Sequence, residues 1–187
     1  MNQSFGAIKR WRMQIFAITW LAYAAFYFTR KAFSVAKLGI AEDPGFMLDK
    51  AAMANLDAIY LAGGNTFVLL HHLRRSGLDE ILPQLLDDGM LYLGASAGAA
   101  VAGSDIEPLG LMDDPAEAPQ LDSTRGLGLV DAVLLPHADG QLPPYPTSLV
   151  DKIVSTYGQR FPLQRIDDDQ ALLVVDGVAT IVPSPLG

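Results

Sequence analysis

The chain has 187 residues, of which 50% are hydrophobic and 18% are charged. This length suits one domain of ordinary size, and the apolar content excludes an intrinsically disordered chain. Cysteine is absent, which excludes disulfide scaffolds and thiolate chemistry. The formal net charge of −8 is uneven, because residues 1–50 carry seven Lys/Arg and three Asp/Glu, whereas residues 51–187 carry six and eighteen. The acidic bulk predicts no nucleic-acid partner, since it would repel the phosphates.

A hydrophobic segment dominates the first fifty residues. The stretch Met13–Phe28 has no charged residue, is rich in aromatic residues and has basic residues on both sides. It is slightly shorter than the ~20 residues that span a bilayer, but aromatic and basic side chains at its ends extend its reach. We therefore expect a transmembrane-like helix through which the chain could associate with a membrane. A buried core helix is the alternative. A signal peptide is disfavoured, because bulky Phe26 and Tyr27 follow the small residues.

The region from about Met1 to Ala62 resembles the first transmembrane helix of sugar-phosphate transporters of the major facilitator superfamily, with the loop and the start of the second helix. In that family an arginine in a phrase like Tyr-Phe-Thr-Arg-Lys helps to bind the substrate phosphate, and Arg30 is the matching residue. Such transporters place their site between two multi-span halves, which nothing after Leu61 supplies. Residues 1–56 are thus predicted to form a transporter-like hydrophobic helix and loop, separate from residues 57–187.

Residues 57–187 alternate short apolar runs with helical patterns, which is typical of an α/β fold with a parallel or mixed three-layer sheet. The region Asp113–Thr124 is rich in proline and acidic residues, and we expect a surface loop there. The predicted strands are Ala58–Ala62, Met90–Gly94, Ala132–Pro136, Ala171–Val175 and Val178–Val182. The predicted helices are Thr66–Arg75, Leu78–Asp88, Ala97–Ala102 and Ser148–Tyr157.

The strongest motif is Gly94-Ala95-Ser96-Ala97-Gly98, which matches G-x-S-x-G between a predicted strand and a predicted helix. In that context a sharp turn lifts the serine hydroxyl out of the backbone. The N–H of Ala97 then points to where an oxyanion would develop, and the helix N-terminus adds positive potential. We therefore predict that Ser96 is a nucleophile. The alternative is a serine that merely caps a helix in a turn of small residues.

A serine nucleophile needs a base, which is usually histidine. His137 directly follows the strand Ala132–Pro136, at the carboxyl-end position where sites assemble in α/β sheets. His71 and His72 lie within a predicted helix and are better interpreted as surface or packing residues. We therefore expect His137 to be the base. The acid that orients it stays open on this evidence, with Asp113 and Asp114 in the acidic loop and Asp167, Asp168 and Asp169 before the late strand as candidates.

The turn Gly63-Gly64-Asn65-Thr66 forms a second candidate site. Paired glycines after a strand allow close approach of a ligand and present free N–H groups. With Ser96, we expect this turn to form the other half of an oxyanion hole and Gly63, Asn65 and Thr66 to contact substrate. A phosphate loop is a weaker interpretation, because the lysine of a P-loop is missing. A simple tight turn is the other alternative.

These residues carry a second resemblance. The ordered set GGNT, GASAGA and PH, continued weakly by IDDDQALLVVDG, resembles the dipeptidase E and cyanophycinase family of serine peptidases over about Asp57 to Gly187. The resemblance implies a fold like that of class I glutamine amidotransferases and activity, without metal or cofactor, on short peptides with an N-terminal aspartate. It implies a cytoplasmic location for this part. By this resemblance, Ser96 and His137 would be the nucleophile and base, and Gly64 and Ala97 would contribute the oxyanion amides.

The same resemblance implies two versions of the triad acid. One version matches Asp113 or Asp114 in the loop after the nucleophile, and the other matches Asp168; we favour Asp113. Family members usually carry further strands before the GGN segment, where this chain has the transporter-like segment, so the sheet is expected to lack its first strands. The predicted function is a serine-type hydrolase, a peptidase or dipeptidase that acts on short, Asp-containing peptides through a Ser-His-Asp triad. A membrane transporter fragment and an inactive fusion remnant are the alternatives. No oligomeric state is predicted.

Overall fold

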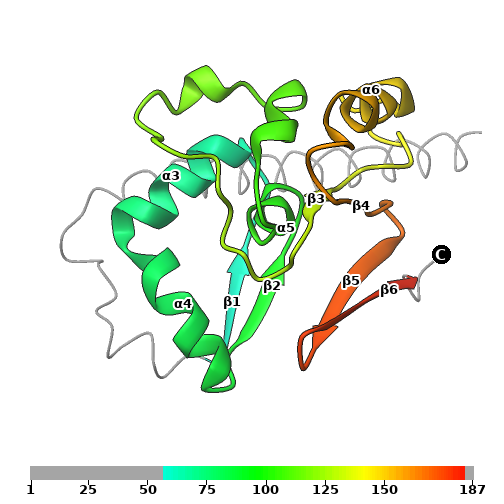
Figure 1. The fold of residues 1–187 in the computed structure, drawn as a ribbon. Helices are drawn as coiled ribbons and strands as arrows, with labels where there is room; N and C mark the ends of the chain where they lie inside the picture. The colour runs from blue at the N-terminus through cyan, green and yellow to red at the C-terminus, as the bar shows by residue number, and fades with distance from the viewer. Residues whose placement is uncertain (1–56, 184–187) are drawn as a thin grey trace, which may run out of the picture. The chain divides into compact units, whose positions relative to one another are not determined.

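A computed structural model describes residues 57–183 (Figure 1), which lie within one compact unit of the chain, Ala54–Gly187. The predicted hydrophobic helix at Met13–Phe28 and the transporter-like region 1–56 lie outside the described residues. Between residues 57 and 183, no helix combines the length and the apolar character that crossing a membrane requires.

The first half of the described region is a strand–helix–helix–strand unit followed by a short helix. It contains β1 (Ala58–Leu61), α3 (Thr66–Ser76), α4 (Leu78–Asp87), β2 (Leu91–Gly94) and α5 (Ala97–Val101). The side chain of Asn65 caps α3 by accepting hydrogen bonds from two N–H groups of its first turn. Gly77 ends α3 with a φ of 72°, a left-handed conformation that favours glycine, and α4 starts at the next residue.

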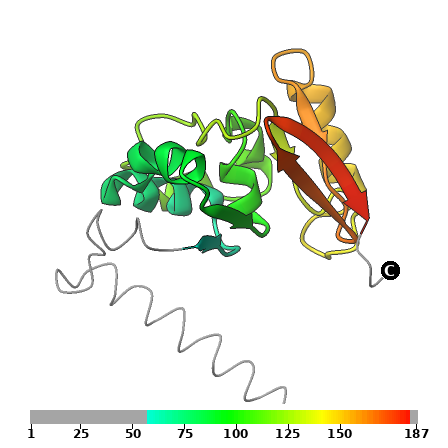
Figure 2. The same cartoon turned by 90° about the horizontal axis from the view of Figure 1, so that it is seen from below.

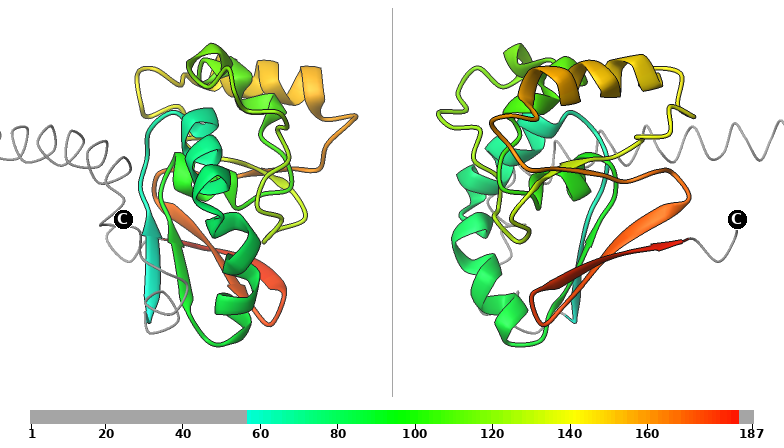
Figure 3. Two further views of the ribbon diagram at one scale, coloured as in Figure 1. Left: turned by 90° about the vertical axis from the view of Figure 1, so that its left-hand side faces the viewer. Right: turned by 45° about the vertical axis from the view of Figure 1, so that its right-hand side comes forward.

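The second half contains two short 3₁₀ helices, another crossover unit and a hairpin. Its elements are η2 (Glu107–Leu111), η3 (Pro115–Glu117), β3 (Val133–Leu135), α6 (Thr147–Tyr157), β4 (Leu163–Arg165), β5 (Gln170–Val175) and β6 (Val178–Pro183). Asp176 and Gly177 both have positive φ, which suits the tight turn that joins β5 to β6. Figure 3 shows α6 beside the segment that carries η2, and the two elements are in contact.

The strands pair two by two in residues 57–183, and this corrects the single three-layer sheet that the sequence predicted. β1 pairs with β2 and β3 with β4, both in parallel, whereas β5 and β6 are antiparallel. The edge of β3 is taken by β4, a three-residue strand that the sequence analysis did not predict. Side chains rather than backbone hydrogen bonds join the pairs. Leu134 of β3 is buried in a cluster to which Tyr92 of β2 and Leu172 of β5 also belong.

The main core lies between α3, α5 and the strands β1 and β3. Side chains from all four elements are buried in one cluster that includes Leu61, Phe67, Leu70, Val101 and Leu135. Figure 2 shows α3 and α4 on one side of the unit and the β5–β6 hairpin on the other. The α5 helix therefore starts in the middle of the unit, between these two flanks, where the ends of the parallel strands meet (Figure 1).

Candidate active site

The register of the two parallel pairs decides which residues meet beyond the strand ends. Leu61 of β1 lies opposite Gly94 of β2, so Gly63 and Ser96 each follow their strand by two residues. A Cβ atom placed on Gly63 would lie 3.2 Å from Cβ of Ser96, which confirms that the two residues are neighbours. In the other pair, Leu135 lies opposite Arg165, and the following residues include His137 and Asp168.

Ser96 occupies a strained turn between β2 and α5. Its φ of 54° and ψ of −115° are sparsely populated by residues other than glycine. The glycines on either side allow the turn to close. A Cβ on Gly94 would lie 2.6 Å from the carbonyl oxygen of Gly98, and a Cβ on Gly98 would overlap the carbonyl of Leu61 in β1. The strand–turn–helix context predicted for the G-x-S-x-G motif is therefore present.

Two hydrogen bonds connect the serine, the histidine and an aspartate in a row. The Oγ of Ser96 lies 2.8 Å from Nε2 of His137, and Nδ1 of the same ring lies 2.5 Å from Oδ1 of Asp168. His137 itself has a φ of 60°, the left-handed conformation. Its side chain is only 15% exposed, and that of Asp168 is 32% exposed. A neutral imidazole that donates from Nδ1 to the carboxylate would leave Nε2 free to accept the serine proton.

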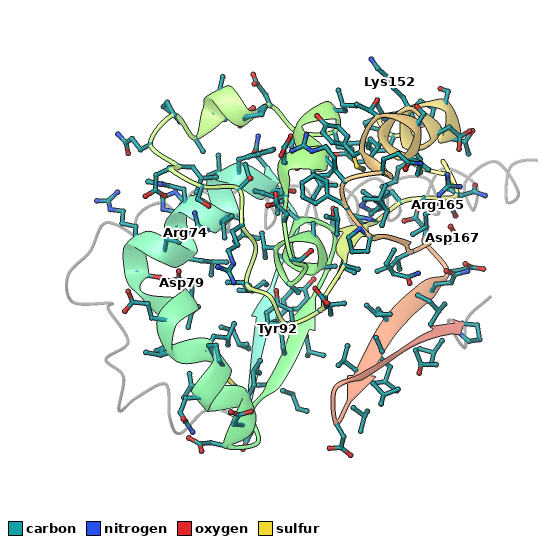
Figure 4. The ribbon with its side chains drawn as sticks, viewed as in Figure 1. Arg74, Asp79, Tyr92, Lys152, Arg165 and Asp167 are labelled. Atoms are coloured by element: carbon teal, nitrogen blue, oxygen red, sulfur yellow. The ribbon has the colours of Figure 1, made fainter. Side chains whose placement is uncertain are left out.

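Asp168 rather than Asp167 reaches the histidine because a local turn engages Asp167. The Oδ2 of Asp167 accepts a hydrogen bond from the side chain of Gln170, and its backbone carbonyl accepts one from the N–H of the same residue. Asp167 and Arg165 are drawn at the end of β4 in Figure 4. The turn before β5 thus presents the next carboxylate, that of Asp168, to the imidazole.

Asp113, which the sequence analysis favoured as the acid, does not contact His137 in this structure. Its Oδ2 accepts hydrogen bonds from the backbone N–H of Thr66 at 2.9 Å and from the Thr66 hydroxyl at 2.5 Å. The carboxylate that lies on the imidazole belongs to Asp168, the alternative, so the geometry does not support the preference for Asp113. The physical reason is the β3–β4 pairing, which places the end of β4 beside His137.

Asp114 and Asn65 take part in local structure. Oδ1 of Asp114 accepts from the N–H of Ala116 and so caps η3. The amide of Asn65 caps α3 and also donates to the backbone carbonyl of Asp114 at 2.9 Å. The structure therefore does not bring Asp114 to the histidine. The contacts of Asn65 in the structure join the GGNT turn to the loop between η2 and η3, and its predicted contact with substrate stays a prediction.

The predicted oxyanion amides have no competing hydrogen-bond partner in the described part of the chain. Among the hydrogen bonds made between residues 57 and 183, none uses the backbone N–H of Gly64 or of Ala97. Gly64 has a φ of 150°, a conformation that side chains rarely adopt, directly after Gly63 beside Ser96. Ala97 is the first residue of α5, where N–H groups lack intrahelical acceptors. Both donors can therefore bind an oxygen of a bound molecule.

Tyr145 belongs to the site although the sequence analysis did not select it. Its ring stacks on the His137 ring with centroids 5.4 Å apart and an interplanar angle of 14°. Its hydroxyl lies 3.5 Å from Oδ1 of Asp113, and burial, followed by the charge and hydrogen bonding of that carboxylate, raises the pKa of Tyr145. Tyr145 lies in a proline-rich loop before α6, and no motif marked it. Tyr145 also lines a small pocket beside Ser96 and His137. The residues that line this pocket are Thr66, Ser96, Ala97, Ala100, Leu109, Met112, Asp113, Pro136, His137 and Tyr145.

Tyr92 supports the turn from below. Its hydroxyl donates a hydrogen bond of 2.5 Å to the backbone carbonyl of Gly98, in the first turn of α5, and burial raises its pKa. Figure 4 shows Tyr92 at β2, beneath α5.

In the described part of the chain, no group of three or more His, Asp or Glu side chains is placed to hold a metal ion.

Comparison with known proteins identifies the family of the chain. Peptidase family S51 matches residues 20–182 of the chain. The chain belongs to Peptidase family S51. The S51 match begins well inside the region that resembles a transporter helix, and the comparisons give that transporter resemblance no support.

Individual relatives are similar to half or more of the chain. An uncharacterized peptidase of Pasteurella multocida is 38% identical over 123 residues, which cover 65% of this chain and 58% of the relative. Peptidase E of Streptomyces coelicolor is 39% identical over 95 residues, or 51% of this chain and 35% of the relative. The chain thus spans less than three fifths of these relatives.

A solved structure shares the α/β fold. A crystal structure from Listeria monocytogenes, described as a candidate peptidase E protein, superimposes with a TM-score of 0.66 at 31% sequence identity. The match covers 77% of this chain and 67% of that chain. The α/β class expected from the alternation of strands and helices is therefore confirmed.

Proposed function

We propose that this S51 chain is a serine peptidase in which Ser96 is the nucleophile, His137 the general base and Asp168 the acid that orients the histidine. The observation that carries the proposal is the continuous path of hydrogen bonds from Oγ of Ser96 through the imidazole to Asp168. A nucleophile in contact with a base, which a third group orients, is the arrangement that activates a serine hydroxyl.

The chemistry follows from these positions. Ser96 Oγ attacks the scissile carbonyl carbon while His137 Nε2 takes the hydroxyl proton. The negative charge that forms on the carbonyl oxygen is bound by the N–H groups of Gly64 and Ala97, which make no other hydrogen bond between residues 57 and 183. The imidazolium then protonates the leaving amine, and a water molecule releases the acyl group by the reverse sequence.

The proposed substrates are short peptides with aspartate at the N-terminus. This choice rests on the resemblance to the dipeptidase E family and on the Streptomyces coelicolor relative, which is named peptidase E. The pocket beside Ser96 is small, and Leu109, Met112 and Tyr145 contribute to its wall. A confined pocket suits one terminal residue better than a long extended chain.

One experiment tests the nucleophile and the substrate together. The full chain is treated with a fluorophosphonate and assayed for hydrolysis of aspartyl-leucine, alongside Ser96→Ala and the matched control Ser148→Ala, which changes an exposed serine of α6. We expect labelling and hydrolysis in the wild type and in Ser148→Ala, and neither in Ser96→Ala. Equal labelling of Ser96→Ala and the wild type, or no hydrolysis by the wild type, would contradict the proposal.

A further inference from the structure

The carboxylate of Asp113 lines the same pocket as Ser96 and His137 without taking part in their hydrogen bonds. Both hydrogen bonds from Thr66 go to Oδ2. The other oxygen, Oδ1, has the Tyr145 hydroxyl, at 3.5 Å, as its only hydrogen-bond partner among the described residues. Because a carboxylate oxygen can accept more than one hydrogen bond, Oδ1 retains acceptor capacity at the pocket wall.

The negative charge of Asp113 is held in place, and no cationic side chain of the described residues neutralises it. Thr66 is the first residue of α3, so the carboxylate lies at a helix N-terminus, where a negative charge is stabilised. None of the ion pairs within residues 57–183 includes Asp113. The pocket therefore presents a fixed anion to whatever occupies it, and a cationic group of a ligand would complete the pair.

Tyr145 places this anion close to the reacting groups. Its ring stacks on His137, and its hydroxyl lies beside Asp113, so a single tyrosine side chain separates the base from the carboxylate. In a peptide whose first peptide bond is cleaved, the α-ammonium nitrogen is two bonds from the carbonyl carbon that Ser96 attacks. A group that recognises this ammonium must therefore lie in the wall of the pocket that contains Ser96.

We propose that Asp113 recognises the free α-ammonium group of the substrate and so restricts cleavage to the N-terminal residue. This inference rests on the proposed peptidase function and adds the group that selects substrates with an unblocked terminus. A peptide acylated at its N-terminus has no positive charge for Oδ1 and adds bulk where the pocket is closed by Tyr145. Asp113 is then a specificity residue, distinct from Asp168 on the histidine.

The test measures binding, so that it does not depend on turnover. The full chain with Ser96→Ala is titrated by calorimetry with aspartyl-leucine, with N-acetyl-aspartyl-leucine and with succinyl-leucine, which lacks only the amino group. We expect the free-amine peptide to bind at least about tenfold more tightly than the other two, as a charge-assisted contact predicts. Adding Asp113→Asn should reduce this preference to within about threefold. Adding Asp114→Asn, which removes the neighbouring charge outside the pocket, should leave it unchanged.

Asparagine keeps the shape of the Asp113 side chain and an oxygen that can accept a hydrogen bond from Thr66. Thermal unfolding checks that the Asp113→Asn variant is folded. The comparison of aspartyl-leucine with succinyl-leucine needs no substitution at Asp113 and stands even if that variant is unstable. Equal binding of the three ligands, no measurable binding of the free-amine peptide, or a preference that survives Asp113→Asn would overturn the inference. If the wild type hydrolyses free and N-acetylated peptides equally well, the peptidase function stands and only the role of Asp113 falls.

Discussion

The row formed by Ser96, His137 and Asp168 depends on which ring nitrogen of the histidine carries the proton. The carboxylate on Nδ1 favours the tautomer with hydrogen on that nitrogen, so that Nε2 faces the serine as an acceptor. An amide in place of the carboxylate could present its oxygen or its NH₂ group, and the latter would stabilise the opposite tautomer. In the proposed mechanism, the identity of the side chain at position 168 therefore decides whether His137 can act as the base.

Asp168→Asn is expected to lower kcat for aspartyl-leucine by roughly 10³- to 10⁴-fold, because the histidine loses the carboxylate that fixes its tautomer. Asp169→Asn changes the neighbouring exposed aspartate and should retain the wild-type kcat. Steady-state kinetics of both variants and of Asp113→Asn rank the three substitutions by their loss of kcat. A larger loss of kcat in Asp113→Asn than in Asp168→Asn would identify Asp113 as the orienting acid instead.

Tyr145 reports on the charge of Asp113. Burial, the negative charge of Asp113 and its hydrogen bond all raise the pKa of Tyr145, so the phenol is neutral at neutral pH. Asp113→Asn removes the charge, and the pKa of Tyr145 should therefore fall toward its ordinary value without reaching it, since the burial remains. The difference in tyrosinate absorbance between each protein and its Tyr145→Phe counterpart, followed through an alkaline titration, measures this. An unchanged pKa would show that the two groups are not coupled.

At the scale of elements, the turn that carries Ser96 is held by backbone contacts with β1 and by a side chain from β2. The start of α5 approaches Leu61 so closely that only glycine fits at position 98. Tyr92 ties the carbonyl of Gly98 to β2. The helix that presents the Ala97 amide is only five residues long, so its orientation depends on these contacts more than on its own hydrogen bonds.

Tyr92→Phe should lower the free energy of unfolding by about 1 kcal/mol, the usual net value of one hydrogen bond. Burial raises the pKa of Tyr92 above the ordinary value of about 10. The neutral hydroxyl therefore stabilises the folded state fully below about pH 10, and this stabilisation is lost as the pH rises through the raised pKa. Urea unfolding at neutral and at alkaline pH should therefore show a smaller alkaline loss in Tyr92→Phe than in the wild type. Tyr60→Phe is the control, because Tyr60 is 64% exposed. Equal losses in both variants would contradict a role for the Tyr92 hydroxyl.

The local patterns of the sequence locate most elements correctly. The apolar run at Met90–Gly94 and the helical pattern at Thr66–Arg75 agree with β2 and α3 to within a residue. In contrast, β4 (Leu163–Arg165) has three residues, of which two are polar, so no periodicity marks it. Its pairing with β3 is a long-range contact, and that contact decides the position of Asp168. The choice between Asp113 and Asp168 could not follow from spacing for this reason.

The same reasoning explains Tyr145 and the loop at Asp113–Thr124. A tyrosine among prolines has no local signature of function, since its stacking on His137 is visible only after the chain has folded. The loop was expected at the surface, and much of it is exposed, but it begins with a residue that lines the pocket. Arg74 of α3 anchors the far end of the loop by donating to the carbonyls of Ser123 and Arg125, and it lies 4.0 Å from Asp79 of α4 (Figure 4).

At the scale of the described unit, burial is concentrated on one side of the strands. Leu70 of α3 is fully buried in the main core, whereas Leu91 and Leu93 of β2 are 63% and 52% exposed. The same contrast holds for the β5–β6 hairpin, where Leu173 is 52% exposed and Ile181 packs inward. Stability therefore depends on the helix-covered face of β1 and β2 far more than on the opposite face.

Leu70→Ala should lower the free energy of unfolding by about 2–5 kcal/mol, because it removes buried surface and leaves a cavity. Leu93→Ala makes the same chemical change on β2 and should cost less than about 1 kcal/mol, since half of the side chain already contacts solvent. Denaturant unfolding of the full chain with each substitution provides the comparison. Similar losses in both variants would mean that the face of β2 that carries Leu93 is covered in solution.

The left-handed backbone at Ser96 and His137 has a consequence for how this chain can change over evolutionary time. Each residue holds a conformation that costs of order 1–3 kcal/mol for a side chain and almost nothing for glycine. If the chain has the proposed peptidase activity, natural selection must maintain both side chains against a standing gain in stability. A lineage released from that selection would drift toward glycine at these two positions and become more stable as it loses its chemistry. Glycine at position 96 or 137 would then mark the inactive descendants of such a peptidase.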